Sequence, residues 1–277
     1  MKKISRRSFL AAAAVSAAAL AMTACGGSAS SAASSVASSA ASSTAASSGA
    51  AALSTVVAGK LTMATNATFP PYEMTTDSGE IEGIDVDTAK AIAEKLGLEL
   101  QVDDMDFDAA LLSVQQGKAD IVMAGVTVTD ERKAVMDFSD SYATGIQSII
   151  VPNDSDIASP DDLAGKKIGT QRGTTGYIYC SDDFGEDSVV AYDNGLTAVQ
   201  ALNNGQVDAV VIDNAPATEY VAANPGLKVL DTSYAEEDYA IGMAKGSALE
   251  DAINKALEEL KEDGTLQSIV DKYINAN

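Results

Sequence analysis

The sequence contains no histidine, no tryptophan and only two cysteines among its 277 residues. The absence of histidine excludes Ser-His-Asp triads and metal sites that need imidazole, whereas a site made of carboxylates alone stays open. Two cysteines cannot form a disulfide framework. If Cys25 near the N-terminus carries a lipid, Cys180 has no disulfide partner. Cys180 is then expected to be a small buried residue rather than a reactive thiol.

Positive charge is scarce as well, since 18 lysines and arginines stand against 40 aspartates and glutamates, a net charge of −22. Four of the cations lie within the first seven residues, and without them the chain has 14 cations against 40 acids and a net charge of −26. So acidic a chain disfavours contact with nucleic acid and with anionic lipid surfaces. We therefore expect no nucleic-acid partner.

Residues 1–24 have the composition of a bacterial export signal. The four cations precede an apolar run over 9–22 that is too short to cross a bilayer core of about 30 Å at about 1.5 Å per residue. Residues 5–10 (SRRSFL) resemble a twin-arginine motif, which implies export of the folded protein; a Sec signal with a fortuitous arginine pair is the alternative. Residues 22–26 (MTACG) resemble a lipobox, with lipid on the Cys25 thiol; the alternative is an incidental cysteine.

Residues 25–59 are almost entirely serine, alanine and glycine, and they carry no charge. Such a composition cannot bury enough apolar surface to fold, so we expect a disordered tether with a reach of roughly 30 Å. An acylated Cys25 would hold it, because acyl chains bury at about 0.8 kcal/mol per CH₂. The prediction is a protein anchored by lipid to the outer face of the bacterial cytoplasmic membrane.

The remaining 218 or so residues, from Lys60 onward, repeat a strand–helix rhythm twice, which indicates an α/β fold. The expected strands are 61–65, 98–102, 146–151, 167–171, 207–212 and 239–244. The expected helices are 88–97, 109–116, 195–204, 215–222, 247–262 and 266–274, with another from Tyr177. Two strands, 146–151 and 239–244, read as crossings between two lobes. One lobe spans 60–144 plus 240–277 and the other spans 145–239.

The stretch 120–142 combines several groups that could hold a small anion. A buried strand end at 121–123 leads to Gly125, which permits close backbone approach because it lacks a Cβ. Thr127 adds a hydroxyl, and Arg132 adds a planar fork that matches a carboxylate. The alternative is that Arg132 pairs with a nearby surface acid, Asp130, Glu131 or Asp137.

A second anion site is expected in the turn 172–176, which opens the helix from Tyr177. Free N–H groups at a helix start, with the hydroxyls of Thr174 and Thr175, favour negative charge, although a plain N-cap has the same pattern. The turn lacks the Gly-Lys-Ser/Thr ending of a Walker motif, and we expect no cofactor.

Other polar and aromatic side chains follow strand ends, where α/β sheets bind ligands. Asn66 and Phe69 lie in a proline-interrupted loop, and Phe107 precedes a helix; either ring could simply belong to the core. Asp213 ends a buried strand, so it needs a cationic partner or caps the helix 215–222. Asp85 and Asp87 precede the helix 88–97 and are expected to cap it.

These segments together resemble the polar amino-acid-binding proteins, the extracellular solute-binding proteins of family 3 that serve ABC importers. The resemblance runs from Leu61 to Tyr273, although Thr88 stands where an aliphatic residue is usual and Met22 departs from the commoner lipobox leucine. It implies a two-lobed periplasmic-binding-protein-like fold of type II, with two hinge crossings and a ligand cleft between the lobes. It also implies a binding protein rather than an enzyme.

The resemblance assigns roles to ten residues: Asn66, Phe69, Phe107, Gly125, Thr127, Arg132, Gln171, Thr174, Thr175 and Asp213. Arg132, Thr127 and Gly125 hold the α-carboxylate of an amino acid, and the turn with Thr174 and Thr175 closes on it from the other lobe. Asp213 and the Gly125 carbonyl take the ammonium. Phe69 and Phe107 flank the side chain, which faces Asn66 and Gln171.

The neutral Asn66 and Gln171 favour a polar uncharged L-amino acid such as glutamine. A basic ligand stays open because Glu73, Asp106 or Asp108 could lie near the side chain, and cystine is a further possibility. The expected partners are the free amino acid and the membrane subunits of an ABC permease. Two other functions stay open, a dehydratase-like exported enzyme on the same fold and a sensor subunit that reports ligand to a membrane receptor.

Overall fold

The computed structural model describes residues 53–274. The predicted signal, the lipobox with Cys25 and residues 26–52 of the predicted tether lie outside the described residues. Within 53–274 no helix has both the length and the apolar composition needed to cross a membrane. The chain already contacts the folded part at Leu53, which packs against the core, and the Val56 N–H donates to Asp120 at 2.8 Å. The fold therefore begins before Lys60, the predicted start.

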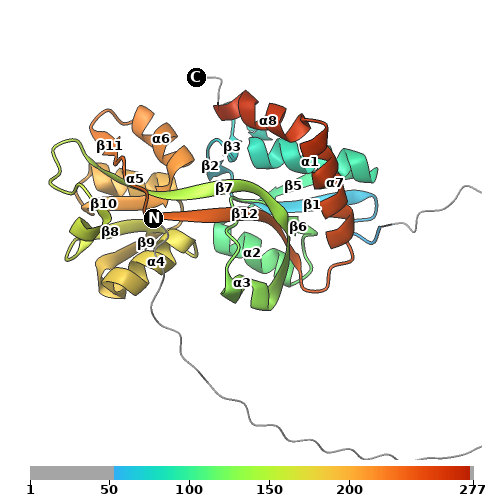
Figure 1. Ribbon diagram of the computed structural model, residues 1–277, viewed down its shortest axis with the longest axis horizontal. Coiled ribbons are helices and arrows are strands. Elements are labelled where there is room, and N and C mark those ends of the chain that lie inside the picture. Colours follow the sequence, from blue (N-terminus) through green and yellow to red (C-terminus); the bar gives the residue numbers. More distant parts are fainter. Residues whose placement is uncertain (1–52, 275–277) are drawn as a thin grey trace, which may run out of the picture. The chain divides into compact units, whose positions relative to one another are not determined.

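One sheet of nine strands runs through the described chain (Figure 1). Its order is β5 (Glu99–Asp104), β1 (Lys60–Thr65), β6 (Ile121–Val122), β12 (Ala235–Ala244), β7 (Met136–Pro152), β10 (Ala209–Asp213), β8 (Ile168–Gln171) and β9 (Val189–Tyr192), and β11 (Leu227–Val229) pairs with β7. The outer strands of each half pair in parallel, and β7 and β12 pair antiparallel. The sequence thus forms the predicted α/β fold.

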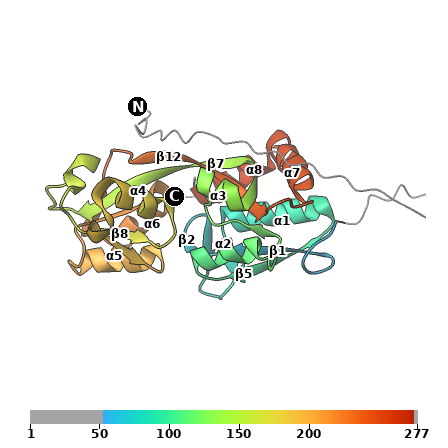
Figure 2. The same cartoon turned by 90° about the horizontal axis from the view of Figure 1, so that it is seen from below.

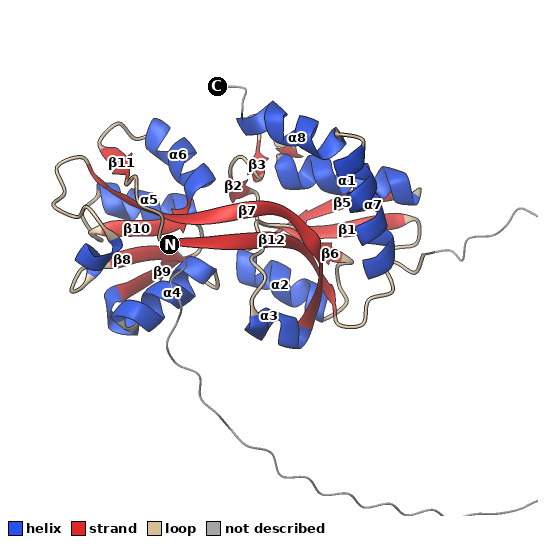
Figure 3. Ribbon diagram, in the orientation of Figure 1, coloured by secondary structure: helices blue, strands red, loops and turns tan. Residues whose placement is uncertain are grey.

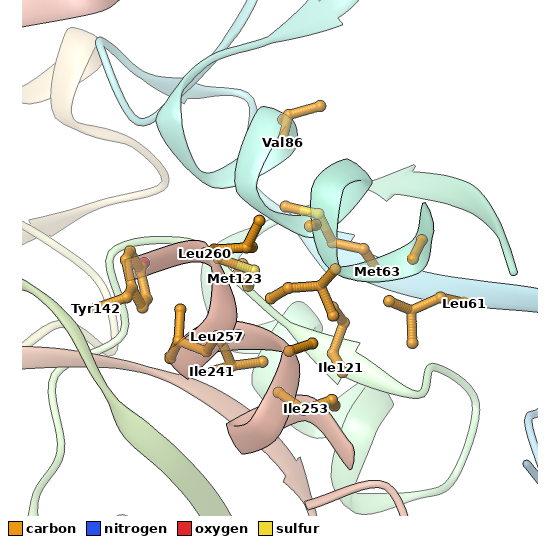
Figure 4. Close-up of a cluster of buried hydrophobic side chains, with 14 of the residues drawn as sticks. Leu61, Met63, Val86, Ile121, Met123, Tyr142, Ile241, Ile253, Leu257 and Leu260 are labelled. Carbon is orange, nitrogen blue, oxygen red and sulfur yellow. The ribbon is translucent and has the colours of Figure 1, made fainter. Parts of the chain in front are cut away.

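Lobe 1 is built on the parallel strands β5, β1 and β6, with helices on both faces (Figure 3). Its helices are α1 (Ile84–Leu96), α2 (Phe107–Gln115), α3 (Asp130–Val135), α7 (Glu250–Glu262) and α8 (Thr265–Ile274). The apolar faces of α1, α7 and α8 share one core with Leu61 and Met63 of β1, drawn in Figure 4. The ring of Phe107 and the rest of α2 form a second core on the other face.

Lobe 2 repeats this arrangement on β10, β8 and β9. Its helices are α4 (Thr175–Phe184), α5 (Gly195–Asn203) and α6 (Asn214–Ala222), with 3-10 turns η1 (Pro160–Leu163) and η2 (Glu186–Ser188). One core includes α5 and α6, and a separate core on the opposite face includes α4. Cys180 is fully buried there, as predicted, and burial raises the pKa of its thiol to about 12.

The two lobes are joined by β7 and β12, which run side by side from one lobe to the other (Figure 2). Their pairing extends from Gln147 opposite Ala235 to Met136 opposite Ala244, with irregular register between Tyr239 and Gly242. Both strands are longer than the predicted crossings 146–151 and 239–244. Strand β7 pairs with β10 in lobe 2 and β12 pairs with β6 in lobe 1, so the hinge consists of paired strands.

Two features were not predicted from the sequence. A small sheet of β2 (Thr68–Phe69), β3 (Glu73–Thr75) and β4 (Ile81–Glu82) covers the stretch that was expected to be a loop, and the prolines lie between β2 and β3. Arg132 lies on α3, a helix of six residues that is too short to show an apolar period.

Candidate functional site

All ten predicted site residues line a single cleft between the lobes, with a cavity volume of about 30 Å³. Parallel strands bring their carboxyl ends to one edge of a sheet, which is where α/β proteins place ligands. Thus Asn66 follows β1, Gln171 ends β8 and Asp213 ends β10. The cleft also includes Glu73, which the sequence offered as a possible neighbour of the ligand side chain, and residues that were not predicted: Ala124, Gln147, Val211, Ile212 and Tyr239.

Arg132 is almost completely buried at the lobe 1 side of the cleft. The Thr129 side chain caps α3 by accepting a bond from the Arg132 N–H at 3.2 Å, and this positions the arginine in the first turn. The guanidinium donates to the Thr127 carbonyl at 2.7 Å and, across the cleft, to the Gly173 carbonyl at 3.1 Å. It also lies over the Phe107 ring, 5.4 Å from the ring centre. Burial lowers the pKa of the guanidinium.

The alternative that Arg132 pairs with a neighbouring surface acid is wrong. Within residues 53–274 it forms no ion pair, and Asp137 binds Lys245 instead at 2.6 Å. Two of the five guanidinium donors are bonded to backbone carbonyls, which leaves the others for an acceptor in the cleft. The nearby carboxylate of Glu237 acts against the lowering of the pKa.

The start of α4 forms the opposite wall. The Thr174 hydroxyl donates to the Gln171 carbonyl at 2.8 Å and accepts a long bond from the Tyr177 N–H at 3.4 Å, so Thr174 is the N-cap. The next hydroxyl, of Thr175, lies 3.3 Å from the hydroxyl of Thr127 in lobe 1. The two predicted anion sites therefore meet across the cleft.

Asp213 is buried at the end of β10, and it caps α6. Its carboxylate accepts from the Ala215 N–H at 3.0 Å and from the Ile146 N–H at 2.8 Å, and Tyr239 provides a side-chain hydrogen bond. Burial raises the pKa of Asp213 to about 6, although these donors oppose the shift. The N-cap role is confirmed, and the carboxylate keeps lone pairs for a ligand cation, which stays a prediction.

Gly125 adopts a left-handed conformation with φ of 55°, and its N–H donates to Asp85 at 3.0 Å. Because this N–H already donates to Asp85, it does not bind a ligand carboxylate in this structure, in contrast to the predicted role. A Cβ at this position would lie 2.9 Å from Cε1 of Phe69, so only glycine lets the ring pack here.

At the other end of the cleft, two amides join the lobes. The Gln171 side chain donates to Oδ1 of Asn66 at 2.9 Å, and Asn66 donates to the Met105 carbonyl at 2.9 Å. The Phe69 ring stacks on Tyr72 with centroids 5.8 Å apart. This end of the cleft therefore combines the Phe69 ring with an amide pair, and its role as a pocket for the ligand side chain stays a prediction.

Glu73 is the acid that the cleft includes at this end. Of the three acids considered from the sequence, Glu73 lines the cleft, whereas Asp106 and Asp108 do not. It is fully buried on β3, and neither carboxylate oxygen receives a hydrogen bond from an N–H group within the described chain.

Glu237 is a second buried acid, and the sequence carried no signal for it because it lies among the similar residues Glu236 and Asp238. Its carboxylate accepts from the Thr127 hydroxyl at 3.1 Å and from the Gln147 amide at 2.9 Å. It thereby orients Thr127 from the crossing strand β12. Residues 53–274 contain no group of three or more histidine, cysteine or acidic side chains placed to bind a metal.

Asp85 and Asp87 do not cap α1, in contrast to the prediction. The helix begins at Ile84, ahead of the predicted start, and its first N–H groups donate to the carbonyls of Pro71 and Tyr72 instead. Asp85 consequently points into the lobe and accepts from the Gly125 N–H, while Asp87 pairs with Lys272 at 2.7 Å.

Comparison with known proteins places this geometry in a family. The model of the bacterial extracellular solute-binding proteins, family 3, matches residues 61–276. A probable histidine-binding protein of Neisseria gonorrhoeae is 36% identical over 219 residues, which cover 76% of this chain and 81% of that protein.

Solved structures agree with the fold. The arginine-, lysine-, histidine-binding protein ArtJ of Geobacillus stearothermophilus is 34% identical with a TM-score of 0.75, covering 79% of this chain and 96% of that chain. An ancestral arginine-binding protein bound to arginine is 45% identical with a TM-score of 0.74, covering 78% and 98%. One bound to glutamine is 43% identical with a TM-score of 0.73 and the same coverage.

These relatives are binding proteins rather than enzymes, and so is this chain. Its two α/β lobes, hinge strands and interlobe cleft have the type II architecture of the matched structures. With the family match over nearly all of the described residues, the chain belongs to the bacterial extracellular solute-binding proteins of family 3.

Proposed function

We propose that this protein is the substrate-binding subunit of an amino-acid ABC importer and that it captures a free L-amino acid with a cationic side chain, arginine first. It delivers this ligand to the membrane subunits of the permease. The observation that carries the cationic preference is Glu73, a fully buried carboxyl group in the lining of the cleft that receives no bond from an N–H donor within the described chain.

The α-carboxylate of the ligand binds Arg132 and the hydroxyls of Thr127 and Thr175. These groups come from both lobes and already lie together, with 3.3 Å between the two hydroxyls. The α-ammonium binds Asp213 and the Gly125 carbonyl. Because one ligand contacts both lobes, its binding energy favours the closed state of the hinge.

The ligand side chain lies between the Phe69 and Phe107 rings and extends toward Glu73. A guanidinium suits this site because it is planar, stacks on aromatic faces and meets a carboxylate with two hydrogen bonds. Burying a carboxylate is costly unless a cation meets it, so a cationic side chain gains most from Glu73. Several similar structures are those of arginine-binding proteins.

Glutamine is the second candidate, and the amides of Asn66 and Gln171 favour it. These amides can bond a ligand amide once their mutual bond opens. Ancestral arginine-binding proteins have been solved with arginine and with glutamine, so related clefts accept either ligand.

The protein acts outside the cytoplasm, as its family does, and we propose that lipid on Cys25 anchors it to the outer face of the cytoplasmic membrane. The twin-arginine-like signal 1–24 is removed, and the tether up to about residue 52 spans the distance to the permease. Cys25→Ser should release the protein from the membrane fraction into the medium. Protein that stays membrane-bound with serine at this position would exclude the lipid anchor.

A thermal-shift screen against the L-amino acids tests the ligand. The sample is the chain from residue 25 with Cys25→Ser, called the unlipidated chain below, unfolded and refolded to remove carried ligand. A ligand at a hundred times its Kd adds about 2.7 kcal/mol of stability. We expect arginine to give the largest shift and glutamine a smaller one. If no L-amino acid shifts the transition, the proposal is wrong.

A transport measurement separates an importer subunit from a sensor. Deleting the gene should abolish uptake of radiolabelled arginine by the cells, and expression of the full chain should restore it. Uptake that survives deletion would favour the sensor role.

A further inference from the structure

Two buried carboxyl groups face each other beside the cleft. Glu73 on β3 and Asp85 in the first turn of α1 are both 0% exposed. They meet because α1 starts directly against the segment before Glu73: the Asp85 N–H donates to the Tyr72 carbonyl at 2.9 Å. Gly83 makes this approach possible, since a Cβ there would lie 2.1 Å from the Tyr72 oxygen.

The hydrogen bonds distinguish the two carboxyl groups. Asp85 accepts from the Gly125 N–H at 3.0 Å and from the Tyr142 hydroxyl at 2.8 Å. Neither oxygen of Glu73 receives a hydrogen bond from an N–H or hydroxyl donor within the described chain, and the charge of Asp85 acts on this carboxyl group. Two adjacent buried carboxylates cannot both be charged at low cost, and the donors at Asp85 favour a proton on Glu73.

The surroundings of the pair supply no positive charge. No lysine or arginine in residues 53–274 forms an ion pair with Glu73 or Asp85. The groups that act on Glu73 are Asp85 from α1 and Asp104 from β5, and the phenols of Tyr72 and Tyr142 interact with the pair. Burial raises the pKa of the Tyr220 phenol on α6, and the charge of Glu73 adds to this shift. The ring of Tyr239 on β12 packs on Tyr72.

Burial moves both acids in the same direction. It raises the pKa of Glu73 well above its usual range, and the charge of Asp85 adds to this shift. It raises the pKa of Asp85 to about 6, opposed by the bonds from Gly125 and Tyr142. Burial therefore favours a pair that holds a proton over one in which both groups are charged.

We propose that the Glu73–Asp85 pair keeps its proton when the ligand side chain is neutral and releases the proton to solvent when the side chain is a cation, so that the pair determines the charge specificity of the cleft. The inference rests on the proposed amino-acid ligand. A cation beside two carboxylates leaves the same net charge as a proton shared between them. Exchange of one for the other therefore avoids burying an uncompensated charge.

The exchange makes the affinity for arginine depend on pH differently from the affinity for glutamine. Release of one proton raises the arginine association constant by up to tenfold per pH unit. Asp213, with its pKa raised to about 6, also titrates, but it meets the α-ammonium common to both ligands. The ratio of the two association constants therefore isolates the carboxyl pair.

The experiment is isothermal titration calorimetry of the unlipidated chain with L-arginine and with L-glutamine between pH 5.5 and 8. Buffers of different ionisation enthalpy report the protons exchanged. At pH 7 we expect arginine to release about one proton more than glutamine does. The ratio of association constants should rise toward alkaline pH by up to tenfold per unit.

Two variants assign the effect to the pair. Glu73→Gln should make the arginine-to-glutamine ratio independent of pH, lower it at pH 8, and remove the extra proton release. Glu94→Gln, which removes an exposed acid of α1, should behave like the unchanged chain. Because the proton count is measured on the unchanged chain, the test does not depend on the folding of a variant.

The outcomes separate this inference from the proposed function. If arginine binds with the same proton exchange and pH dependence as glutamine, the inference is wrong and the binding function stands. Binding of glutamine without binding of arginine would also overturn it. If neither amino acid binds, both proposals fail.

Discussion

The buried side chain of Arg132 bonds to both lobes. Its guanidinium reaches carbonyls of both lobes, Thr127 at 2.7 Å and Gly173 at 3.1 Å, and it lies over Phe107. A planar fork can do this while keeping further donors for a carboxylate, whereas the ammonium of a lysine is a single point charge.

Replacing Arg132 should therefore weaken binding of every L-amino acid alike. For Arg132→Ala we expect the Kd for arginine and for glutamine to rise together by roughly tenfold to a hundredfold, since hydrogen bonds to charged groups contribute about 1.5–3 kcal/mol. Arg132→Lys should give an intermediate loss, and Lys133→Ala, an exposed neighbour, none. A loss confined to one ligand in calorimetric titrations would contradict the shared α-carboxylate role.

Gly125 matters for a steric reason. Gly125→Ala places a methyl group 2.9 Å from the Phe69 ring and costs about 1–2 kcal/mol for the left-handed backbone. We expect lower unfolding free energy in urea together with weaker arginine binding, because Phe69 must move.

The matched control is Gly79→Ala. Gly79 has a φ of 84°, with nothing within 4 Å of its would-be Cβ. The Gly79→Ala variant should lose a comparable amount of unfolding free energy and keep its affinity for arginine. Equal affinities for the two variants would show that contact with Phe69 does not influence the cleft.

Among the elements, the paired strands β7 and β12 link the hinge to the cleft. Gly145 of β7 lies opposite Glu237, and Tyr239 of β12 contacts Asp213. A Cβ at residue 145 would lie 2.5 Å from the Tyr239 ring. The ring can therefore occupy its buried position only above a glycine.

Gly145→Ala should displace Tyr239 and, through it, Asp213. We expect a loss of about 1–3 kcal/mol in unfolding free energy, which is typical of overpacking, and a higher Kd for both arginine and glutamine. Thr144→Ala, at the neighbouring exposed position, should change neither quantity. Unchanged binding by Gly145→Ala would mean that the hinge strand tolerates the methyl group without moving Tyr239.

For the whole molecule, three buried acids determine how stability responds to pH. Burial raises the pKa of Asp85 and of Asp213 to about 6, and it raises the pKa of Glu73 well above its usual range. Between about pH 4 and 6 the folded state then binds more protons than the unfolded state. The unfolding free energy therefore falls as pH rises through this range, opposite to the usual behaviour of paired carboxylates.

The ligand-free unlipidated chain should thus melt at a higher temperature at pH 5 than at pH 7.5. pKa shifts of this size change the unfolding free energy by a few kcal/mol, which changes the Tm by roughly 5–10 °C for a domain of this length. Asp213→Asn should reduce the difference between the two pH values, and Asp187→Asn, which removes an exposed acid, should leave it nearly unchanged. A Tm that rises from pH 5 to 7.5 would show that these carboxyl groups are not destabilised by burial.

Much of this organisation could be predicted because it depends on local pattern. The helices 195–203 and 214–222 and the strand 209–213 follow from apolar periodicity and caps, and predicted site residues such as Asp213 lie at the ends of such elements. The start of α1 could not be predicted, because the carbonyls of Pro71 and Tyr72 accept hydrogen bonds from its first N–H groups in place of a side-chain cap. The helix α3 could not be predicted because six residues are too few to show an apolar period.

The sequence by itself determined the α/β class, the acidic charge, the order of the elements and the residues at strand ends, because hydrophobic period and turn chemistry act over a few neighbours. Only the tertiary structure decided which acids are buried at and beside the cleft. Glu73, Asp85 and Glu237 look like any of the 40 acidic residues along the chain. Their burial depends on the packing of β3, α1 and β12, and desolvation there raises the pKa of Glu73 and of Asp85.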